Sequence, residues 1–156
     1  MAQANGNGSW TVYLSGEIHS DWREQIKKGV EAHQLPVELV SPVTDHDSSD
    51  DCGVDILGDE ANPFWKDHKG AKVNAIRTRT LIEKSDVTVV RFGDKYRQWN
   101  AAFDAGYAAA LGKSIIVLHD PGLTHALKEV DAAALAVAET PDQVVRILNY
   151  TINGTL

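Results

Sequence analysis

Hydrophobic residues along the chain form short continuous runs that are separated by longer segments with helical spacing. The runs are rich in β-branched or other apolar side chains and cover residues 10–15, 37–40, 87–90, 114–118 and 135–138. Continuous apolar runs of this length are typical of strands in a parallel sheet that is covered on both faces. The pattern therefore predicts five strands.

The segments between these runs carry apolar side chains at helical intervals. They cover residues 21–33, 71–84, 101–111, 124–130 and 141–152. Asp21 and Glu24 have the spacing of a capping box, and Pro141 opens the last segment. Strands that alternate with helices predict a three-layer α/β fold of the Rossmann/flavodoxin type, with a five-stranded parallel sheet in the order 2-1-3-4-5.

Two segments fall outside this alternation. Residues 1–9 have neither a positive region nor an apolar core, which predicts a disordered tail ahead of a single domain over 10–156. Residues 43–70 are acidic and irregular. Asp45, Asp47 and their neighbours indicate either a solvated loop or, less favoured by their spacing, a metal site. Phe64 and Trp65 in this segment would cover a pocket or pack as a satellite cluster.

Composition narrows the function classes. The chain has 156 residues, a net charge of -7 and one cysteine, Cys52. The negative charge argues against a nucleic-acid partner, and no apolar run reaches the roughly 20 residues of a membrane span. A single cysteine cannot form a disulfide within the chain, and we expect a cytoplasmic protein. No cofactor and no metal are expected.

The segment from Trp99 to Lys113 is almost free of charge, since Asp104 is the one charged side chain between Arg97 and Lys113. A helix this apolar is expected to be buried, with the sheet on one face and another helix or subunit on the other. A buried carboxylate is costly unless donors hold it. Asp104 therefore either caps or pairs within the fold or serves chemistry.

The predicted strand order places a crevice between the first and third strands, at their carboxyl ends. Gly16, Glu17 and His19 follow the first strand there, and Gly93 follows the third. Glu17 is a second candidate carboxylate or an exposed loop acid, and His19 a candidate donor. Aromatic faces could stack on a heteroaromatic base, and arginines could hold a phosphate. The candidates for the base are Tyr13, Phe92, Tyr96 and Trp99. The candidates for the phosphate are Arg91, Lys95 and Arg97, with Arg77 and Arg79 nearby.

Three motifs in this order resemble the nucleoside 2-deoxyribosyltransferase-like superfamily: Tyr13-Leu14-Ser15-Gly16, residues 84–90, and Phe103-Asp104-Ala105-Gly106-Tyr107. Within it, residues 16–23 and the segment 92–100, which ends in Trp99-Asn100, resemble the YtoQ family. The YtoQ resemblance extends over nearly the whole chain after residue 9.

The resemblance implies chemistry at an N-glycosidic bond. It gives Asp104 the place of a glutamate that attacks the anomeric carbon of a deoxyribonucleoside, as in retaining glycosidases. Asp104 is one methylene shorter than that glutamate, and Gln98 and the Arg77 to Arg79 segment stand where further acids are expected. Glu17 is then the candidate acid or base.

Three functions are compatible with these features. The first is a nucleoside or nucleotide N-glycosidic transferase or hydrolase with Asp104 and Glu17 as catalytic residues. The second is a non-catalytic binder of a nucleotide-like ligand, and the third an assembly protein that uses the alanine-rich helix. Small residues on that helix also predict a homodimer or higher homo-oligomer.

Overall fold

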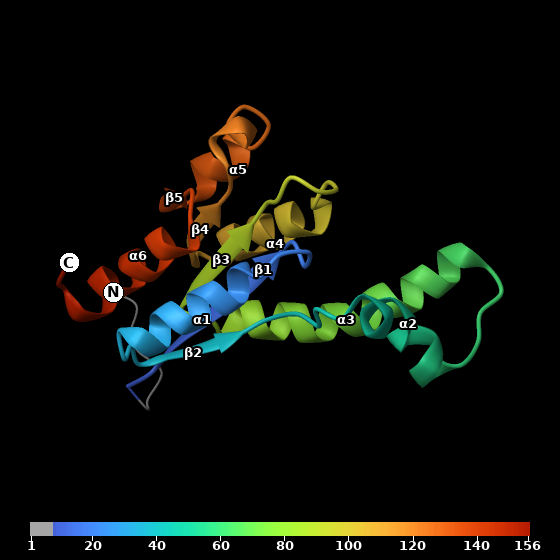
Figure 1. Cartoon of the computed structure of the whole chain (residues 1–156). Helices are drawn as coiled ribbons and strands as arrows, with labels where there is room; N and C mark the ends of the chain where they lie inside the picture. The colour runs from blue at the N-terminus through green and yellow to red at the C-terminus, as the bar shows by residue number, and fades with distance from the viewer. Residues whose placement is uncertain (1–7) are drawn as a thin grey trace.

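The structure, a computed structural model, describes residues 8–156 and is built around one parallel sheet (Figure 1). The strands are β1 (Trp10–Gly16), β2 (Val37–Val40), β3 (Val87–Arg91), β4 (Ser114–Leu118) and β5 (Ala136–Ala138). Their order is β2-β1-β3-β4-β5, and all neighbours are parallel. The α/β class and the strand order predicted from the sequence are confirmed.

Helices cover both faces of the sheet. One face is covered by α1 (Trp22–Ala32) and α6 (Pro141–Asn153), and the other by α3 (Pro63–Lys84), α4 (Trp99–Ala110) and α5 (Lys128–Ala133). A short 3₁₀ turn (Pro121–Leu123) precedes α5. The predicted helix over 124–130 therefore begins and ends later than its sequence pattern indicates.

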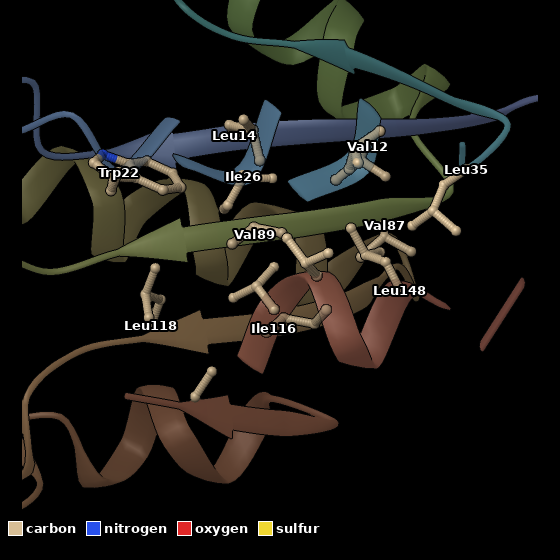
Figure 2. Packing of buried hydrophobic residues seen from close by; sticks show 14 residues of the cluster. Val12, Leu14, Trp22, Ile26, Leu35, Val87, Val89, Ile116, Leu118 and Leu148 are labelled. Carbon is tan, nitrogen blue, oxygen red and sulfur yellow. The ribbon is translucent and has the colours of Figure 1, made fainter. Parts of the chain in front are cut away.

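Alternation along the strands divides the core in two. Val12 and Leu14 of β1 face α1 and α6, in the cluster that Figure 2 shows with Trp22 and Ile26. Because successive side chains of a strand point to opposite faces, Tyr13 lies on the other side, with Ala101 and Ala105 of α4, and Ser15 shares that side.

The segment that we predicted to be irregular, 43–70, is mostly helical, so this prediction was wrong. Residues His46–Leu57 form α2, and α3 already begins at Pro63. Asp45 caps α2 by accepting from the Ser48 backbone N–H at 2.9 Å, and Asn62 caps α3 in the same way through Phe64 N–H. Most of the acidic residues of this segment therefore lie on α2 or α3, where they face solvent.

These two helices pack as an antiparallel arm that projects from the sheet (Figure 1). Gly53 and Gly70 meet so closely that a Cβ on Gly53 would stand 2.3 Å from the Gly70 nitrogen. Lys66 pairs with Asp51 at 2.8 Å, and the Asn74 side chain donates to the Ser49 carbonyl at 2.9 Å. The arm is therefore fixed by packing and by polar contacts.

Two further expectations about the helices need correction. Asp21 stands at the start of α1, but its side chain makes no capping bond and instead accepts from Gln25. The capping box is found at α6, where Thr140 and Gln143 exchange hydrogen bonds. The helix α4 is buried along one face only, because Phe103 on its outer face is 65% exposed.

Of the predicted tail 1–9, residues 1–7 lie outside the described part of the chain. Within the described part, Ser9 Oγ donates a hydrogen bond of 3.1 Å to the Pro36 carbonyl. No helix within residues 8–156 is long and apolar enough to cross a membrane.

Candidate functional site

An open groove of about 1170 Å³ lies at the carboxyl ends of β1 and β3. Its walls come from the loop after β1, the segment after β2 with the start of α2, the groove side of α3, the loop before α4 and α4 itself. It holds most of the residues that the sequence proposed for a site, namely Gly16, Glu17, His19, Arg77, Tyr96, Trp99, Asn100 and Asp104. The remaining four, Tyr13, Phe92, Gly93 and Arg91, do not line it.

Asp104 occupies the second turn of α4 and faces the groove. The Ser15 hydroxyl, at the end of β1, donates to Asp104 Oδ2 at 2.6 Å. Within residues 8–156 Asp104 takes part in no ion pair. Burial raises the pKa of the Asp104 carboxyl above its usual value, and the Ser15 hydrogen bond opposes part of that rise. The arrangement is a half-buried carboxylate with a single neutral donor.

Tyr13 and Phe92 cannot stack on a ligand, which corrects the sequence expectation for both. Tyr13 is fully buried and Phe92 is 4% exposed, and both belong to the core beneath α4. The Tyr13 hydroxyl has no hydrogen-bond partner in the described part of the chain. Burial, with the negative charge of Asp104 as the second cause, raises the pKa of Tyr13 to about 12. Tyr13 is therefore a neutral phenol behind the groove.

Glu17 lines the groove but is tightly held. Its Oε2 accepts from the backbone N–H of His19 at 2.6 Å and of Ser20 at 3.1 Å, and its Oε1 accepts from the Ser20 hydroxyl. Burial alone would raise the pKa of Glu17, but these hydrogen bonds and the charge of Arg91 together lower it. Glu17 is thus an ionised carboxylate that orders its own loop.

Close backbone contact joins the two loops at the sheet edge. Gly16 has φ +112°, and a Cβ there would stand 2.1 Å from the Arg91 carbonyl oxygen, so the position requires glycine. A Cβ on Gly93 would lie 3.0 Å from Glu17 Cγ. Gly93 N–H donates to the Gln98 side chain at 3.1 Å. Gly93 and Arg91 therefore shape the groove from behind and do not line it.

Sequence reasoning missed Arg23, which organises the loop after β1. Its guanidinium donates to the carbonyls of Leu14, Gly16 and Glu17 and lies 4.5 Å from the centre of the Trp22 ring. Burial lowers the pKa of Arg23 to about 10, which leaves it charged at neutral pH. No pattern in the sequence indicates this role, because the acceptors are backbone carbonyls.

Aromatic side chains form one wall of the groove. Trp99 is 73% and Tyr96 75% exposed, and the Tyr96 ring lies 4.9 Å from that of His19 across the two loops. Tyr96 adopts φ +61°, a conformation that is uncommon for a side chain of this size. Phe103 completes the wall and was missed, although it lies four residues after Trp99 on the same helix face.

Basic side chains line the opposite part of the groove. Arg77 donates to the Ser41 carbonyl through Nε and Nη2, at 3.2 and 3.0 Å, which engages one edge of its guanidinium. Lys72 and Arg79 of α3 line this part as well, whereas Arg97 lines the groove from the loop that carries Tyr96. Arg91 does not line the groove. The buried Nε of Arg91 has no hydrogen-bond partner within the described residues, and it lies 3.9 Å from Glu17 Oε1.

The acidic segment has no metal-binding geometry in the part of the chain that the structure describes. No group of three or more histidine, cysteine, aspartate or glutamate side chains is arranged there to hold an ion. His46 contacts Asp50 at 3.3 Å on the exposed side of α2. Phe64 and Trp65 neither cover the groove of their own chain nor pack into a core. They stand exposed at the end of the arm, with ring centres 4.9 Å apart.

Comparison with known proteins places the chain in a family. The sequence model described as nucleoside 2-deoxyribosyltransferase YtoQ matches residues 13–152. The chain belongs to this YtoQ family. An uncharacterized protein YtoQ of Bacillus subtilis (strain 168) is 44% identical over 139 residues, which covers 89% of this chain and 94% of the relative. The resemblance inferred from the sequence motifs is confirmed.

Solved structures show that the YtoQ fold is shared more widely. A 2-deoxyribosyltransferase from Bacillus psychrosaccharolyticus superposes with a TM-score of 0.52 at 16% identity, covering 86% of this chain and 90% of the other. A conserved protein from Enterococcus faecalis V583 gives a TM-score of 0.62 at 12% identity, covering 92% and 99%. At these identities the similarity establishes the fold.

Proposed function

We propose that the groove binds a nucleoside or nucleotide and that Asp104 attacks the anomeric carbon of its sugar. The observation that carries this proposal is the state of Asp104, a half-buried carboxylate in an open groove. Among residues 8–156 it is held by one hydroxyl and by no cation. An acid that served only the fold would be expected to have an internal cationic partner. Membership of the YtoQ family and the fold shared with a deoxyribosyltransferase support the same reading.

The geometry supports the following chemistry. Asp104 Oδ2 is held by Ser15, while Oδ1 has no hydrogen bond within the described residues and is free to react. Oδ1 forms a bond to the anomeric carbon as the bond to the base nitrogen breaks. The electron pair of that bond leaves with the base, which takes a proton from solvent. Water or a second base then displaces the Asp104 ester and restores the carboxylate.

Aromatic and basic side chains give the groove two further binding features. Trp99, Tyr96 and Phe103 offer exposed faces for the base, and stacking contributes about 1 to 3 kcal/mol per base in other proteins. Arg79 and Arg97 suit a 5′-phosphate because neither forms an ion pair within residues 8–156.

Glu17 is assigned a different role from the acid or base suggested by the sequence. Its lowered pKa leaves it without a proton to give at neutral pH, and its oxygens accept three hydrogen bonds from the loop. We therefore assign Glu17 to positioning of the loop beside Asp104.

The experiment is incubation with a panel of nucleosides, deoxynucleosides and their monophosphates, with base release measured by liquid chromatography. We expect release by the wild type and a loss of at least about 1000-fold for Asp104→Asn, which cannot form the ester. Asp94→Asn, an exposed aspartate outside the groove, is the matched control and should keep full activity. A 2-fluoro-2-deoxynucleoside should add the mass of its sugar to the wild type alone.

Absence of both base release and adduct across the panel would contradict the catalytic proposal. The held state of Glu17 then favours the second candidate, a non-catalytic binder of the same ligand class. In that case calorimetry would detect binding to the wild type without turnover, and Asp104→Asn would weaken binding only by the loss of one hydrogen-bond acceptor, about tenfold.

A further inference from the structure

His19 is a titratable group of the groove that takes no part in the attack by Asp104. Three of the described histidines line the groove, and two of them, His46 and His68, stand in the arm on α2 and α3. His19 instead lies in the loop after β1, at the sheet edge where Ser15 holds Asp104. Within residues 8–156 its ring nitrogens form no hydrogen bond and no ion pair. They are therefore available to a ligand.

The position of the His19 ring is defined by both loops of the sheet edge. Its backbone N–H donates to Glu17 Oε2 at 2.6 Å, which fixes the residue from the side of β1. Its ring centre lies 4.9 Å from that of Tyr96, with the two planes tilted by 47°. The side chain is exposed, so the ring can exchange protons with solvent. Imidazole is also the side chain that gives and takes protons most readily near neutral pH.

The aromatic wall brings a stacked base beside this ring. Tyr96 and Trp99 are 75% and 73% exposed, and both line the groove. A base that stacks on Tyr96 has its edge beside His19, because the rings of these two residues are already in contact. The edge of a base carries the nitrogens and carbonyl oxygens that accept a proton. His19 is therefore placed to donate to that edge.

The other candidate acids at this end of the groove are committed elsewhere. Asp104 must be ionised to attack, and Glu17 has a lowered pKa and no proton to give at neutral pH. Gln98 is an amide whose Oε1 accepts from Gly93 N–H at 3.1 Å and whose Nε2 donates to the Lys95 carbonyl at 2.5 Å. A nucleoside base leaves more easily when it is protonated, so the attack by Asp104 needs an acid.

We propose that His19 is the catalytic acid and base of the groove, an inference that rests on the proposed function. First, Asp104 Oδ1 bonds to the anomeric carbon, the carbon–nitrogen bond breaks with its electron pair on the base, and the His19 imidazolium gives that base a proton. Water then bonds to the anomeric carbon, the bond to Asp104 breaks with its pair on the carboxylate, and the water proton moves to the neutral imidazole. His19 thus carries the proton that solvent supplies, and both side chains return to their starting states.

The side chain of His19 can be replaced without releasing the loop. Glu17 accepts from the backbone N–H groups of His19 and Ser20 and from the Ser20 hydroxyl. None of these contacts uses the imidazole ring. His19→Gln therefore removes the acid while it keeps the hydrogen bonds that order the loop.

Two substrates with the same sugar test the proposal in single-turnover experiments. One is the nucleoside that the wild type cleaves fastest, and the other is the 4-nitrophenyl glycoside of its sugar, whose phenolate leaves without a proton. We expect His19→Gln to release the base about 100-fold more slowly than the wild type and to release nitrophenolate at the wild-type rate. His125→Gln, an exposed histidine outside the groove, is the matched control and should keep both rates.

Chemical rescue separates lost chemistry from altered shape. Imidazole added to His19→Ala should restore part of the rate of base release, because a free imidazolium in the open groove can give the same proton. It should restore nothing to Asp104→Asn. Rescue needs only the nucleoside, so it also decides the case in which the nitrophenyl glycoside is not accepted.

Failure of this inference is distinguishable from failure of the proposed function. If the wild type releases base, the role of His19 is overturned when His19→Gln loses nothing, when it loses equally on both substrates, or when imidazole does not rescue His19→Ala. A wild type that releases nitrophenolate but no base overturns the role of His19 and leaves Asp104 as the nucleophile. A wild type that releases neither overturns both.

Discussion

At the scale of single residues, the state of Asp104 decides what the groove can do. Burial removes water from a carboxylate and so destabilises its charged form. The neutral hydroxyl of Ser15 offsets only part of this destabilisation at Asp104. The position is therefore stabilised less than an acid in an ion pair would be. A residue that is costly to the fold and open to a groove is expected to be retained for chemistry.

The Ser15 hydroxyl gives the first prediction at this scale. Ser15→Ala removes the donor that favours the charged form, so the pKa of Asp104 should rise further above its usual value. Because the nucleophile must be ionised, the acid limb of kcat/KM against pH should move to higher pH. One hydrogen bond to a charged group corresponds to about a tenfold loss on that limb. Base release measured across the acid range checks this.

Ser15→Thr keeps the hydroxyl and is the control, with an acid limb close to that of the wild type. A Ser15→Ala profile that falls equally at every pH would instead indicate a purely structural role for the hydroxyl.

At the scale of elements, the sheet was predictable and the arm was not. Buried parallel strands are continuous apolar runs, so their positions and order could be predicted from residues such as Val87 to Val90. Helix α2 has little apolar periodicity. Its cap at Asp45 is local, but its close contact between Gly53 and Gly70 depends on α3, which a local pattern does not reveal.

The candidate site was likewise predictable only in part, namely where it depends on the order of the strands. Topology alone placed Asp104 and Gly16 at one sheet edge, which the groove confirms. The stacking role of Tyr13 was wrong because an aromatic side chain on a central strand with both faces covered lies in the core. The hydrogen bonds of Glu17 follow from the loop conformation, which residue spacing does not define.

The two candidate caps give a prediction at the element scale. Thr140→Ala removes the capping box of α6 and should lower the free energy of unfolding by about 1 kcal/mol. Asp21→Ala, at the start of α1, should change it by no more than about 0.5 kcal/mol, because that side chain only contacts Gln25. Urea denaturation of both variants measures the difference. A larger loss for Asp21→Ala would show that the box predicted at α1 does form in solution.

At the scale of the whole molecule, the two loops at the sheet edge behave as one unit. Gly16 lies against the Arg91 backbone, Gly93 lies against the Glu17 side chain, and Arg23 binds the carbonyls between them. These contacts join β1 and α1 to β3, which lies more than 50 residues later in the sequence. The ionised Glu17 carboxylate is at their centre, so its protonation should be felt by the stability of the whole domain.

Glu17→Gln tests this as a pH dependence. The pKa of Glu17 is lower in the folded chain than its ordinary value, so the folded state binds this proton less readily than the unfolded state does. Its contribution is therefore complete above the ordinary glutamate pKa and is lost as the pH falls through the lower folded value. At neutral pH the variant should unfold with about 1 to 2 kcal/mol less free energy than the wild type.

The two stability curves should converge as the pH falls, because acid removes from the wild type the charge that the variant already lacks. Glu24→Gln, an exposed carboxylate on α1, should stay within about 0.5 kcal/mol of the wild type throughout. Thermal unfolding across the acid range measures all three. A constant offset between Glu17→Gln and the wild type would contradict the prediction, because the loss would then not come from the charge that acid neutralises.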